Sequence, residues 1–420
     1  MSLATLKKDA ASAIDAMADE LLALSHAIHD EPELALEEHK AAKRLSDAVE
    51  GHGLPVQRGA FGLETAYVSE FGKPDGPSIG ILSEYDALPG VGHACGHNII
   101  ATSGLGAALA LAKLADRLPG RVRYLGTPAE ERFGGKEIMA REGAFDRVDA
   151  AMMMHPASLD LVSMPCIAIS EVEATYFGRA AHASAMPYRG LNALDAVVTA
   201  YQSIAQLRQH IRQTERIHGI ITDGGLAANI VPERAGCRFY VRAADAHDLA
   251  ALKKRVHACF EGAATATGCR LELLWGNTDY LDLKTNWPMA GAFERNAEAL
   301  GREFFPLKDI PPGFAGSTDM GNVSHRVPSI HPMFAVAPSE VIIHNAEFAR
   351  WAASERGDRA VLDGAKALAM TALDLMCDVP LLTRVKSDFE ATAEASQNAL
   401  RTMQDSSAAH HHHGAACGCA

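Results

Sequence analysis

The stretch SIGILSEYDALPGVGHACGHNIIATSGLGAALALAKLADRLPGRVRYLG, residues 78–126, predicts an α/β fold. Residues 78–83 form a mostly apolar run that we expect to be a strand, and a second strand is expected at 121–126. Between them, residues 98–114 have the length and composition of a helix, with Asn98 as its expected N-cap. A strand, a helix and a second strand in this order are typical of a parallel sheet.

The same alternation extends on both sides of this stretch. A strand is expected at 65–71, and residues 5–53 read as helical. After residue 126 we expect a short helix beyond Gly134-Gly135 and an apolar strand at 150–154. Because the later strands are nearly all apolar, the sequence predicts a mostly parallel sheet with helices on both faces.

From about residue 168 the pattern changes to β-α-β-β-α-β, which is the order of a ferredoxin-like α+β unit. After this unit, the helix and strand pattern of the first part resumes. We therefore expect a small domain inserted into a larger one. The expected segments are 1–167 and 286–385 for the two parts of the large domain, 168–285 for the insert, and 386–420 for a tail that is helical and then disordered.

Composition excludes some classes of function. The 420 residues carry a formal net charge of −13, which disfavours nucleic acid as a partner because phosphate binding needs clustered Lys and Arg. The most apolar stretch, 99–112, is shorter than the roughly 20 residues that a membrane span requires. The eight cysteines are scattered, and the N-terminus lacks the apolar core of a signal peptide. We expect a cytoplasmic protein that contacts neither nucleic acid nor membrane.

The strongest local motif is Gly92-His93-Ala94-Cys95-Gly96-His97-Asn98, between an expected strand and an expected helix. A Cys sulfur and a His nitrogen both suit zinc and similar divalent metals. The alternative is a buried structural Cys beside a hydrogen-bonded His, and for this motif alone the two interpretations have equal weight.

Three further strand ends carry polar side chains. Glu130 and Glu131 follow one strand, where one carboxylate could bind a metal while the other holds a water. His155 and His344 each end an apolar run. Alone, each of these features has a structural explanation, but together they predict a metal-assisted hydrolytic site. His331 could be a ligand, a substrate contact or a core residue, and we prefer His344 as the ligand.

With these residues in view, the chain resembles the metallopeptidase family of aminoacylase, carboxypeptidase G and the indole-acetyl-amino-acid hydrolases. It is most similar to the branch with aminobenzoyl-glutamate hydrolase and β-alanyl dipeptidases. The resemblance covers roughly residues 20–380. The motifs that carry it are His29-Asp30-Glu31-Pro32-Glu33-Leu34, Glu84-Tyr85-Asp86-Ala87-Leu88-Pro89, residues 93–98, Glu130-Glu131, Met154-His155-Pro156, Gly178-Arg179-Ala180-Ala181-His182-Ala183-Ser184, Asn229-Ile230-Val231-Pro232 and residues 316–324.

The resemblance implies a zinc-peptidase-like catalytic domain, with the insert as a lid and dimerisation domain. It implies two divalent metal ions, Mn or Zn, with Cys95 bridging both. His97 and Glu131 would complete one site, and His155 and His344 the other. The remaining implied roles are Glu130 as the general base, Asp86 as a residue that orients a ligand, His182 as a contact of the scissile carbonyl in the partner's active site, and Asn229 as a substrate contact.

This chain departs from the family at two places. Many members begin the metal site with His-x-Asp, but here that place holds Glu84-Tyr85-Asp86, so His97 is expected to substitute for the absent His. Asn98 stands where much of this branch has Asp, which changes the charge around the ligands without changing the ligands themselves.

The expected function is hydrolysis of an amide C–N bond in a small N-acyl amino acid, an aminobenzoyl-glutamate-like compound or a short dipeptide, by a homodimer formed through the insert. One alternative is an aromatic aminohydrolase that releases ammonia at the same site. A thiol hydrolase with Cys95 as nucleophile and a non-catalytic binding protein explain fewer of the residues.

Overall fold

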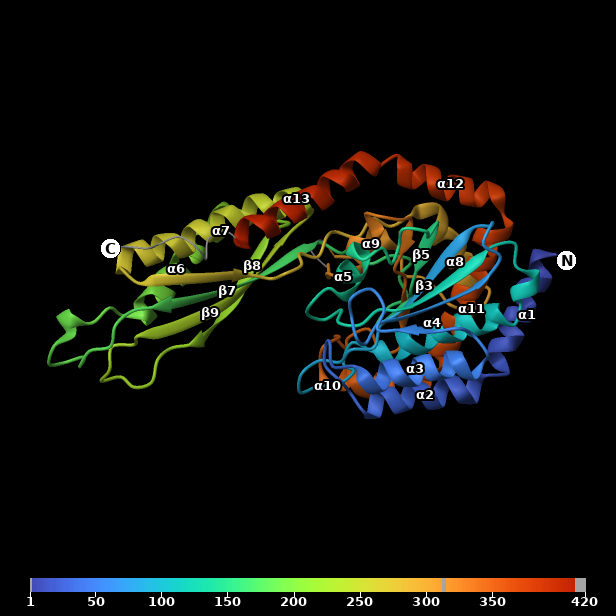
Figure 1. Cartoon of the computed structure of the whole chain (residues 1–420), viewed down its shortest axis with the longest axis horizontal. Helices are drawn as coiled ribbons and strands as arrows, with labels where there is room; N and C mark the ends of the chain where they lie inside the picture. Colours follow the sequence, from blue (N-terminus) through green and yellow to red (C-terminus); the bar gives the residue numbers. More distant parts are fainter. Residues whose placement is uncertain (1, 312–314, 412–420) are drawn as a thin grey trace. The chain divides into compact units, whose positions relative to one another are not determined.

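The computed structural model describes residues 2–311 and 315–411, with side chains up to residue 405. The chain divides into two compact units (Figure 1). Unit 1 contains the residues up to Pro165 together with Leu283–Ser396, and unit 2 contains Cys166–Asp282 together with the segment that starts at Gln397. A small unit is therefore inserted into the sequence of a larger one.

Unit 1 contains a six-stranded sheet in the order β1-β2-β4-β3-β5-β11. Its strands are β1 (Gln57–Arg58), β2 (Tyr67–Gly72), β3 (Ser78–Ser83), β4 (Arg121–Gly126), β5 (Ala150–Met152) and β11 (Ser329–Ile330). Strands β4, β3, β5 and β11 run parallel, whereas β1 and β2 are antiparallel to their neighbours. The predicted α/β fold with a mostly parallel sheet is confirmed. A short parallel pair, β6 (His155–Ala157) and β12 (Met333–Ala335), lies outside this sheet.

Successive side chains of each strand point to opposite faces of the sheet, and helices cover both of these faces. In β3, Ile79 and Ile81 join the large core with helices α4 (His97–Ala112) and α11 (Glu355–Cys377). Leu82 joins a second core with α5 (Gly135–Arg141) and α9 (Met320–Ser324). The helices of unit 1 are α1 (Leu3–Asp15), α2 (Ala18–Asp30), α3 (His39–Gly51), α4 (His97–Ala112), α5 (Gly135–Arg141), α8 (Trp287–Glu298), α9 (Met320–Ser324), α10 (Ala346–Ala352), α11 (Glu355–Cys377) and α12 (Val379–Glu390). The segment expected to be helical up to residue 53 is thus three helices.

Helix α4 is buried from His97 to Leu111. It lies close against β3, since a Cβ added at Gly104 would stand 2.3 Å from Ser83 Oγ. The prediction that Asn98 caps this helix is wrong. The cap is Gly96, which has φ 76° and a backbone that lies against Pro156, while Asn98 donates hydrogen bonds to Ser25 and to the carbonyl of Ala352. The helix therefore begins at His97.

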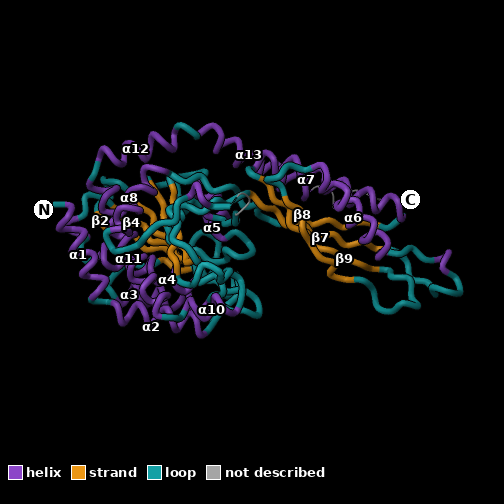
Figure 2. Tube along the Cα trace, turned by 180° about the vertical axis from the view of Figure 1, so that it is seen from behind, coloured by secondary structure: helices purple, strands orange, loops and turns teal. Residues whose placement is uncertain are grey.

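Unit 2 contains a four-stranded antiparallel sheet in the order β10-β7-β9-β8 (Figure 2). Its elements are β7 (Ala168–Phe177), α6 (Ala193–Leu207), β8 (Arg216–Asp223), β9 (Arg234–Ala243), α7 (Ala246–Thr267) and β10 (Arg270–Trp275). This is the β-α-β-β-α-β order read from the sequence. Alternate residues of β7, such as Val172 and Tyr176, pack with Phe260 of α7 in one apolar core.

The tail differs from the separate segment expected at 386–420. Helix α12 precedes α13 (Ala393–His411), and from Gln397 this second helix belongs to unit 2. Met403 is buried there with Ala246 and Leu281. The expected disorder falls in part on residues 412–420, which lie outside the described residues, as do two of the four histidines at 410–413. Among the helices of the described part of the chain, none has the length and apolar character that a bilayer crossing would require.

Candidate metal centre

The predicted site residues of unit 1 come from loops that follow its parallel strands. Asp86 follows β3, Glu130 and Glu131 follow β4, and His155 follows β5. Because β4, β3 and β5 are adjacent and parallel, their carboxyl ends meet at one edge of the sheet. Cys95 and His97 reach the same place from the start of α4.

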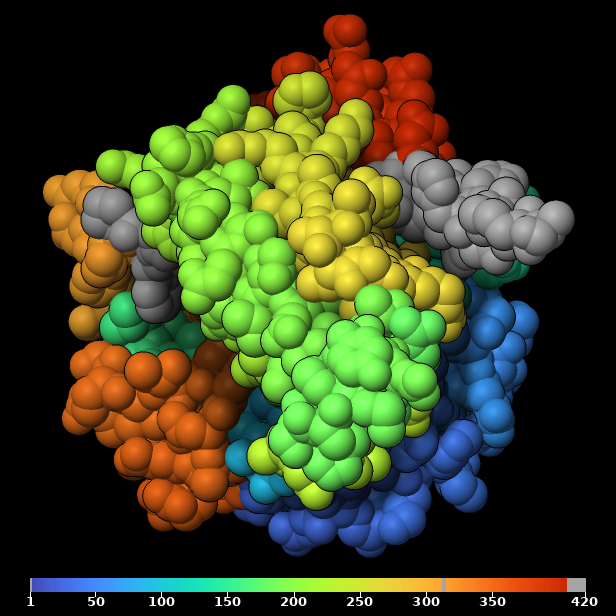
Figure 3. Space-filling model, turned by 90° about the vertical axis from the view of Figure 1, so that its left-hand side faces the viewer, coloured from blue at the N-terminus to red at the C-terminus, as the bar shows by residue number. Residues whose placement is uncertain are grey.

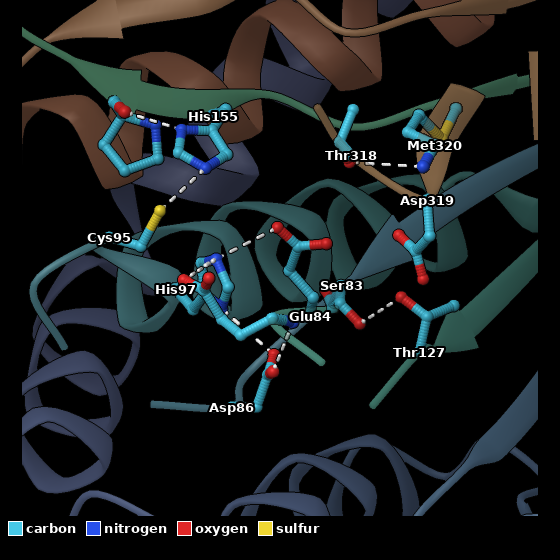
Figure 4. A network of polar contacts seen from close by, with 12 residues as sticks. Ser83, Glu84, Asp86, Cys95, His97, Thr127, His155, Thr318, Asp319 and Met320 are labelled. Carbon is cyan, nitrogen blue, oxygen red and sulfur yellow. Dashed lines mark hydrogen bonds and ion pairs between the residues drawn. The ribbon is translucent and has the colours of Figure 1, made fainter. Parts of the chain in front are cut away.

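Cys95 lies between two histidines that are distant in the sequence. Its Sγ atom is 3.4 Å from Nε2 of His155 and 3.4 Å from Nε2 of His344 (Figure 4 shows the His155 contact). The backbone N–H of His344 donates to the carbonyl of Ala94, which holds the His344 loop against the Cys95 loop. His344 has φ 69°, a conformation that costs a non-glycine residue of order 1 kcal/mol. The tertiary contact therefore holds this side chain in a strained but specific position.

His97 is oriented by Asp86. Nδ1 of His97 lies 3.1 Å from one oxygen of Asp86 (Figure 4). The other oxygen accepts a hydrogen bond from the backbone of Glu131 at 2.9 Å. Burial lowers the pKa of His97, but Glu84, Cys95 and Asp86 outweigh it and raise this pKa well above its usual range. Since Asp86 accepts the Nδ1 proton, Nε2 is the nitrogen that a metal ion could bind in place of a proton. This atom faces Oε1 of Glu131 at 3.8 Å and Oε1 of Glu84 at 3.3 Å.

The donor set fits divalent metal ions. Three groups of side chains each bring their donor atoms within 4.8 Å of one another, namely Cys95 with His97 and His155, Cys95 with Glu131 and His344, and Glu84 with His97 and Glu130. Ligands bound to one ion at 2.0–2.3 Å stand roughly 3.3–3.6 Å apart in a tetrahedral arrangement. Nε2 of His97 and Oε1 of Glu131 are buried without a hydrogen-bond partner among the described residues, which an ion would satisfy. Cys95 belongs to two of the three groups.

Glu130 is buried beside these ligands. Burial, together with the charges of Glu84 and Glu131, raises the pKa of Glu130 well above its usual range. Burial also raises the pKa of Glu131 to about 7, although the charge of His97 opposes it. The preceding residue, Ala129, has φ 63° and donates its N–H to Glu38. This strained turn fixes the directions of the two carboxylates.

The protonation of Cys95 bears on the thiol-hydrolase alternative. Burial and the charge of Glu131 raise the pKa of the Cys95 thiol well above its ordinary value, although His97 opposes the shift. A catalytic cysteine needs a lowered pKa, whereas a metal-bound cysteine is deprotonated by the cation itself. The electrostatics of the site therefore favour Cys95 as a ligand over Cys95 as a nucleophile.

His331 is buried next to His155, with ring centroids 5.4 Å apart. Burial lowers the pKa of His331 well below its usual range, so it is neutral. It is in none of the three groups of candidate ligands among the described residues. This favours His344 over His331 as the last candidate ligand.

The two remaining predicted site residues lie in unit 2. His182 and Ile230 form an isolated bridge, and Ala183 N–H donates to the carbonyl of Asn229, so the loops of His182 and Asn229 are side by side (Figure 3, green and yellow-green). Nδ1 of His182 accepts from the backbone of Ser184 and Ala185. His182 and Asn229 are exposed, and the accepting Nδ1 leaves Nε2–H of His182 as a hydrogen-bond donor.

Sequence reasoning missed a buried ion-pair network beside the site. The Lys136 ammonium lies 2.5 Å from Oε2 of Glu84 and 2.6 Å from Oδ1 of Asp319. Burial alone would lower the pKa of Lys136, but the charges of Asp319 and Glu84 raise it above its ordinary value. Glu84 directly follows a strand and Asp319 lies in the motif at 316–324, but nothing in the sequence pairs Lys136 with Asp319, which is 183 residues away.

Comparison with known proteins places this geometry in context. The family model described as "Peptidase family M20/M25/M40" matches residues 80–373. The Xaa-Arg dipeptidase of Mus musculus is 41% identical over 409 residues, covering 94% of this chain and 94% of the relative. A component chain of the p-aminobenzoyl-glutamate hydrolase of Escherichia coli is 28% identical over 457 residues, covering 91% of this chain and 94% of that protein.

A solved structure shares the fold. The dinuclear metal-binding M20-family peptidase of Bacillus subtilis superposes with a TM-score of 0.62 at 21% identity. The match covers 86% of this chain and 99% of that one. The likeness spans nearly the whole of that solved chain.

Proposed function

This chain belongs to peptidase family M20/M25/M40, and from that premise we propose that the cluster around Cys95 is its dinuclear metal site and that Glu130 is its general base. The protein is a metal-dependent hydrolase that cleaves amide bonds of small substrates. The observation that carries the site proposal is the convergence of Cys95, His155 and His344, in which the two histidine nitrogens each lie 3.4 Å from the shared sulfur.

In the proposed ligand set, His97 and His155 would hold one ion and Glu131 and His344 the other, with Cys95 shared between them. The groups of donor atoms that lie within 4.8 Å of one another support this pairing over the one expected from the resemblance. Asp86 fixes the ring of His97 and the backbone of Glu131. When bound, the two cations would polarise the substrate carbonyl and acidify the attacking water. The negative charge of the shared thiolate would offset the repulsion between the two cations. We propose Mn or Zn as the native metal, since Cys, His and carboxylate ligands tolerate both.

Glu130 takes a proton from the attacking water in this scheme and delivers it to the leaving nitrogen. Its burial supports the role, because a carboxyl with a raised pKa can act first as a base and then as an acid near neutral pH. The names of the relatives describe amide hydrolysis, so we do not retain the release of ammonia from an aromatic amine as the function.

The substrate class that we propose is a dipeptide with a basic C-terminal residue. The support is the Xaa-Arg dipeptidase relative, which is 41% identical and aligned over 94% of both chains. The formal net charge of −13 is compatible with this class, because an acidic protein attracts cationic substrates.

The experiment is a panel of dipeptides that share one N-terminal residue and end in Arg, Lys, Gln or Glu, with p-aminobenzoyl-glutamate added. The amino acids released are measured by mass spectrometry with Mn²⁺ and, separately, with Zn²⁺. We expect kcat/KM to be highest for Arg and Lys. Equal rates for the Gln and Arg peptides would contradict the proposed substrate class, but not the assignment as an amide hydrolase. The Glu130→Gln variant provides the blank for the turnover measurement.

We further propose a homodimer in which unit 2 supplies His182 and Asn229 to the partner's active site. The Nε2–H of His182 would donate to the oxygen of the scissile carbonyl as it gains negative charge. The exposure of both residues supports this role, since neither side chain is buried in the packing of its own unit. A cytoplasmic location is proposed because the six cysteines of the described residues are thiols and form no disulfide there.

A further inference from the structure

The side chain of Glu84 is completely buried and has two different environments at its two oxygens. Oε2 accepts from the Lys136 ammonium at 2.5 Å. Oε1 has no hydrogen-bond partner among the described residues, although it is as buried as the rest of the side chain. An unpartnered buried carboxylate oxygen is costly, so an interaction that satisfies it is expected.

A second electron-pair donor faces this oxygen. Nε2 of His97 lies 3.3 Å from Oε1 of Glu84, and it too has no hydrogen-bond partner among the described residues. Because Nδ1 of His97 carries the proton that Asp86 accepts, Nε2 is the nitrogen that faces Glu84 and that a metal ion can bind in place of a proton. A proton or a metal ion between these two atoms would offset the repulsion of their lone pairs. Ligands of one tetrahedral ion stand roughly 3.3 Å apart, as these two atoms do.

We propose that Oε1 of Glu84 is a further metal ligand, which binds the same ion as His97. The inference rests on the proposed metal site and adds to it a carboxylate that had no assigned role. The group of donors formed by Glu84, His97 and Glu130 supports it, since these atoms lie within 4.8 Å of one another and all three residues are buried. Figure 4 shows Glu84 beside His97.

Lys136 and Asp319 are positioning residues in this arrangement. Asp319 accepts from both the backbone N–H and the ammonium of Lys136, so the ammonium is fixed. The ammonium in turn holds Oε2 of Glu84, which leaves Oε1 directed at His97. Lys136 also neutralises one of the carboxylates crowded at the site, which lowers the cost of burying them.

The test measures Zn²⁺ affinity of the full-length protein, by competition with a chromophoric chelator, and bound metal by mass spectrometry after dialysis. For Glu84→Gln we expect the affinity of one of the two ions to fall at least about 10-fold while the second ion stays bound. Glu84→Asp keeps the charge but shortens the side chain by one methylene, so a ligand role predicts a loss there too. If Glu84→Asp binds both ions as tightly as the wild type, Glu84 acts only through its charge and the inference is wrong.

Two control variants separate this inference from the proposed site. Cys95→Ser should weaken both ions, and if it does not, the proposed metal site itself fails. Glu137→Gln changes a different buried glutamate, which lies in α5 and pairs with Arg326 and Arg141. This variant should leave Zn²⁺ affinity unchanged. Thermal melting of each metal-free variant checks that it is folded.

The role of Lys136 is tested by a double-mutant cycle. Lys136→Met should weaken Zn²⁺ binding in the wild type but cause no further loss in the Glu84→Gln background, because it acts through Glu84. Additive losses would overturn the positioning role. A crystal structure of the Zn²⁺-loaded wild type gives an answer even if the variants do not fold, since Glu84 Oε1 should lie about 2.0–2.2 Å from the ion and a separation above about 3 Å would refute the inference.

Discussion

One carboxylate oxygen of Asp86 lies 3.1 Å from Nδ1 of His97 and so fixes which nitrogen of that ring is available to a metal. The other oxygen accepts the backbone N–H of Glu131. A single buried residue thus orients one candidate ligand through its ring and a second through its backbone. In Asp86→Asn the amide NH₂ must face one of these two donors, so one of the hydrogen bonds is lost.

Asp86→Asn should therefore lower Zn²⁺ affinity about 10- to 100-fold, as is typical when the partner of a ligand is removed. The measurement is a competitive Zn²⁺ titration of the purified variant. Asp75→Asn, at an exposed position, is the matched control and should bind as the wild type does. Unchanged affinity in Asp86→Asn would mean that the ring of His97 is held by its packing alone.

Glu130→Gln should reduce kcat by about 10²- to 10⁴-fold, since it removes the group that moves the proton. Metal content should stay at the wild-type level. Both quantities are measured on one preparation, by turnover of the best dipeptide and by mass spectrometry of bound metal. Glu131→Gln is the contrasting variant, because it should lose metal as well as activity. Persisting turnover in Glu130→Gln would show that another group is the base.

Removal of metal should abolish activity and lower the melting temperature, because ions that bind only the folded state stabilise it. EDTA treatment followed by dialysis is the test, and added Mn²⁺ or Zn²⁺ should restore both activity and melting temperature. The thiol-hydrolase alternative predicts the opposite pattern. It would be supported if EDTA left turnover intact while alkylation of Cys95 removed it.

Mixing two inactive variants tests the contribution of unit 2 to the partner's site. His182→Ala lacks the carbonyl contact and Glu130→Gln lacks the base, so each alone should be nearly inactive. If His182 acts in the partner's site, random exchange of protomers creates hybrid dimers with one complete site, and about a quarter of wild-type activity should return. If no activity returns although native mass spectrometry detects the hybrid dimer, His182 does not act across the dimer.

Glu38 gives the stability of the fold a pH dependence. Burial and the charge of Asp86 raise the pKa of Glu38 to about 7. Because the folded pKa lies above the unfolded one, this contribution to stability is fully present below about pH 4.5. It is lost as the pH rises through about 7, by up to about 3 kcal/mol.

Glu38→Gln should remove this dependence, since the neutral amide can still accept from Ala129 N–H. Relative to the wild type, the variant should gain free energy of unfolding between about pH 5 and pH 8, which urea denaturation at the two pH values measures. Glu50→Gln is the control without a dependence in this range, because hydrogen bonds from Arg58 lower the pKa of Glu50 and its titration falls below about pH 5. A constant difference between wild type and Glu38→Gln would contradict the prediction.

The local sequence pattern was sufficient to predict much of the architecture. The apolar runs at β3 and β4, the helix between them and the β-α-β-β-α-β order of unit 2 follow from periodicity over a few residues, which the sequence states directly. Local pattern was misleading at the start of α4. Asn98 is a good capping residue, but the backbone can turn only at Gly96, where Pro156 leaves no room for a side chain.

By itself the sequence determined which residues could bind metal, because residue type and position at a strand end fix the chemistry that each side chain offers. Only the tertiary structure brought His344 to Cys95 across 249 residues, and only it paired Lys136 with Glu84 and Asp319. The physical reason is that the distances and burial around a side chain decide whether it is a metal ligand, a hydrogen-bonded residue or a member of an ion pair. These are set by segments far apart in the chain, whereas periodicity is set by neighbours.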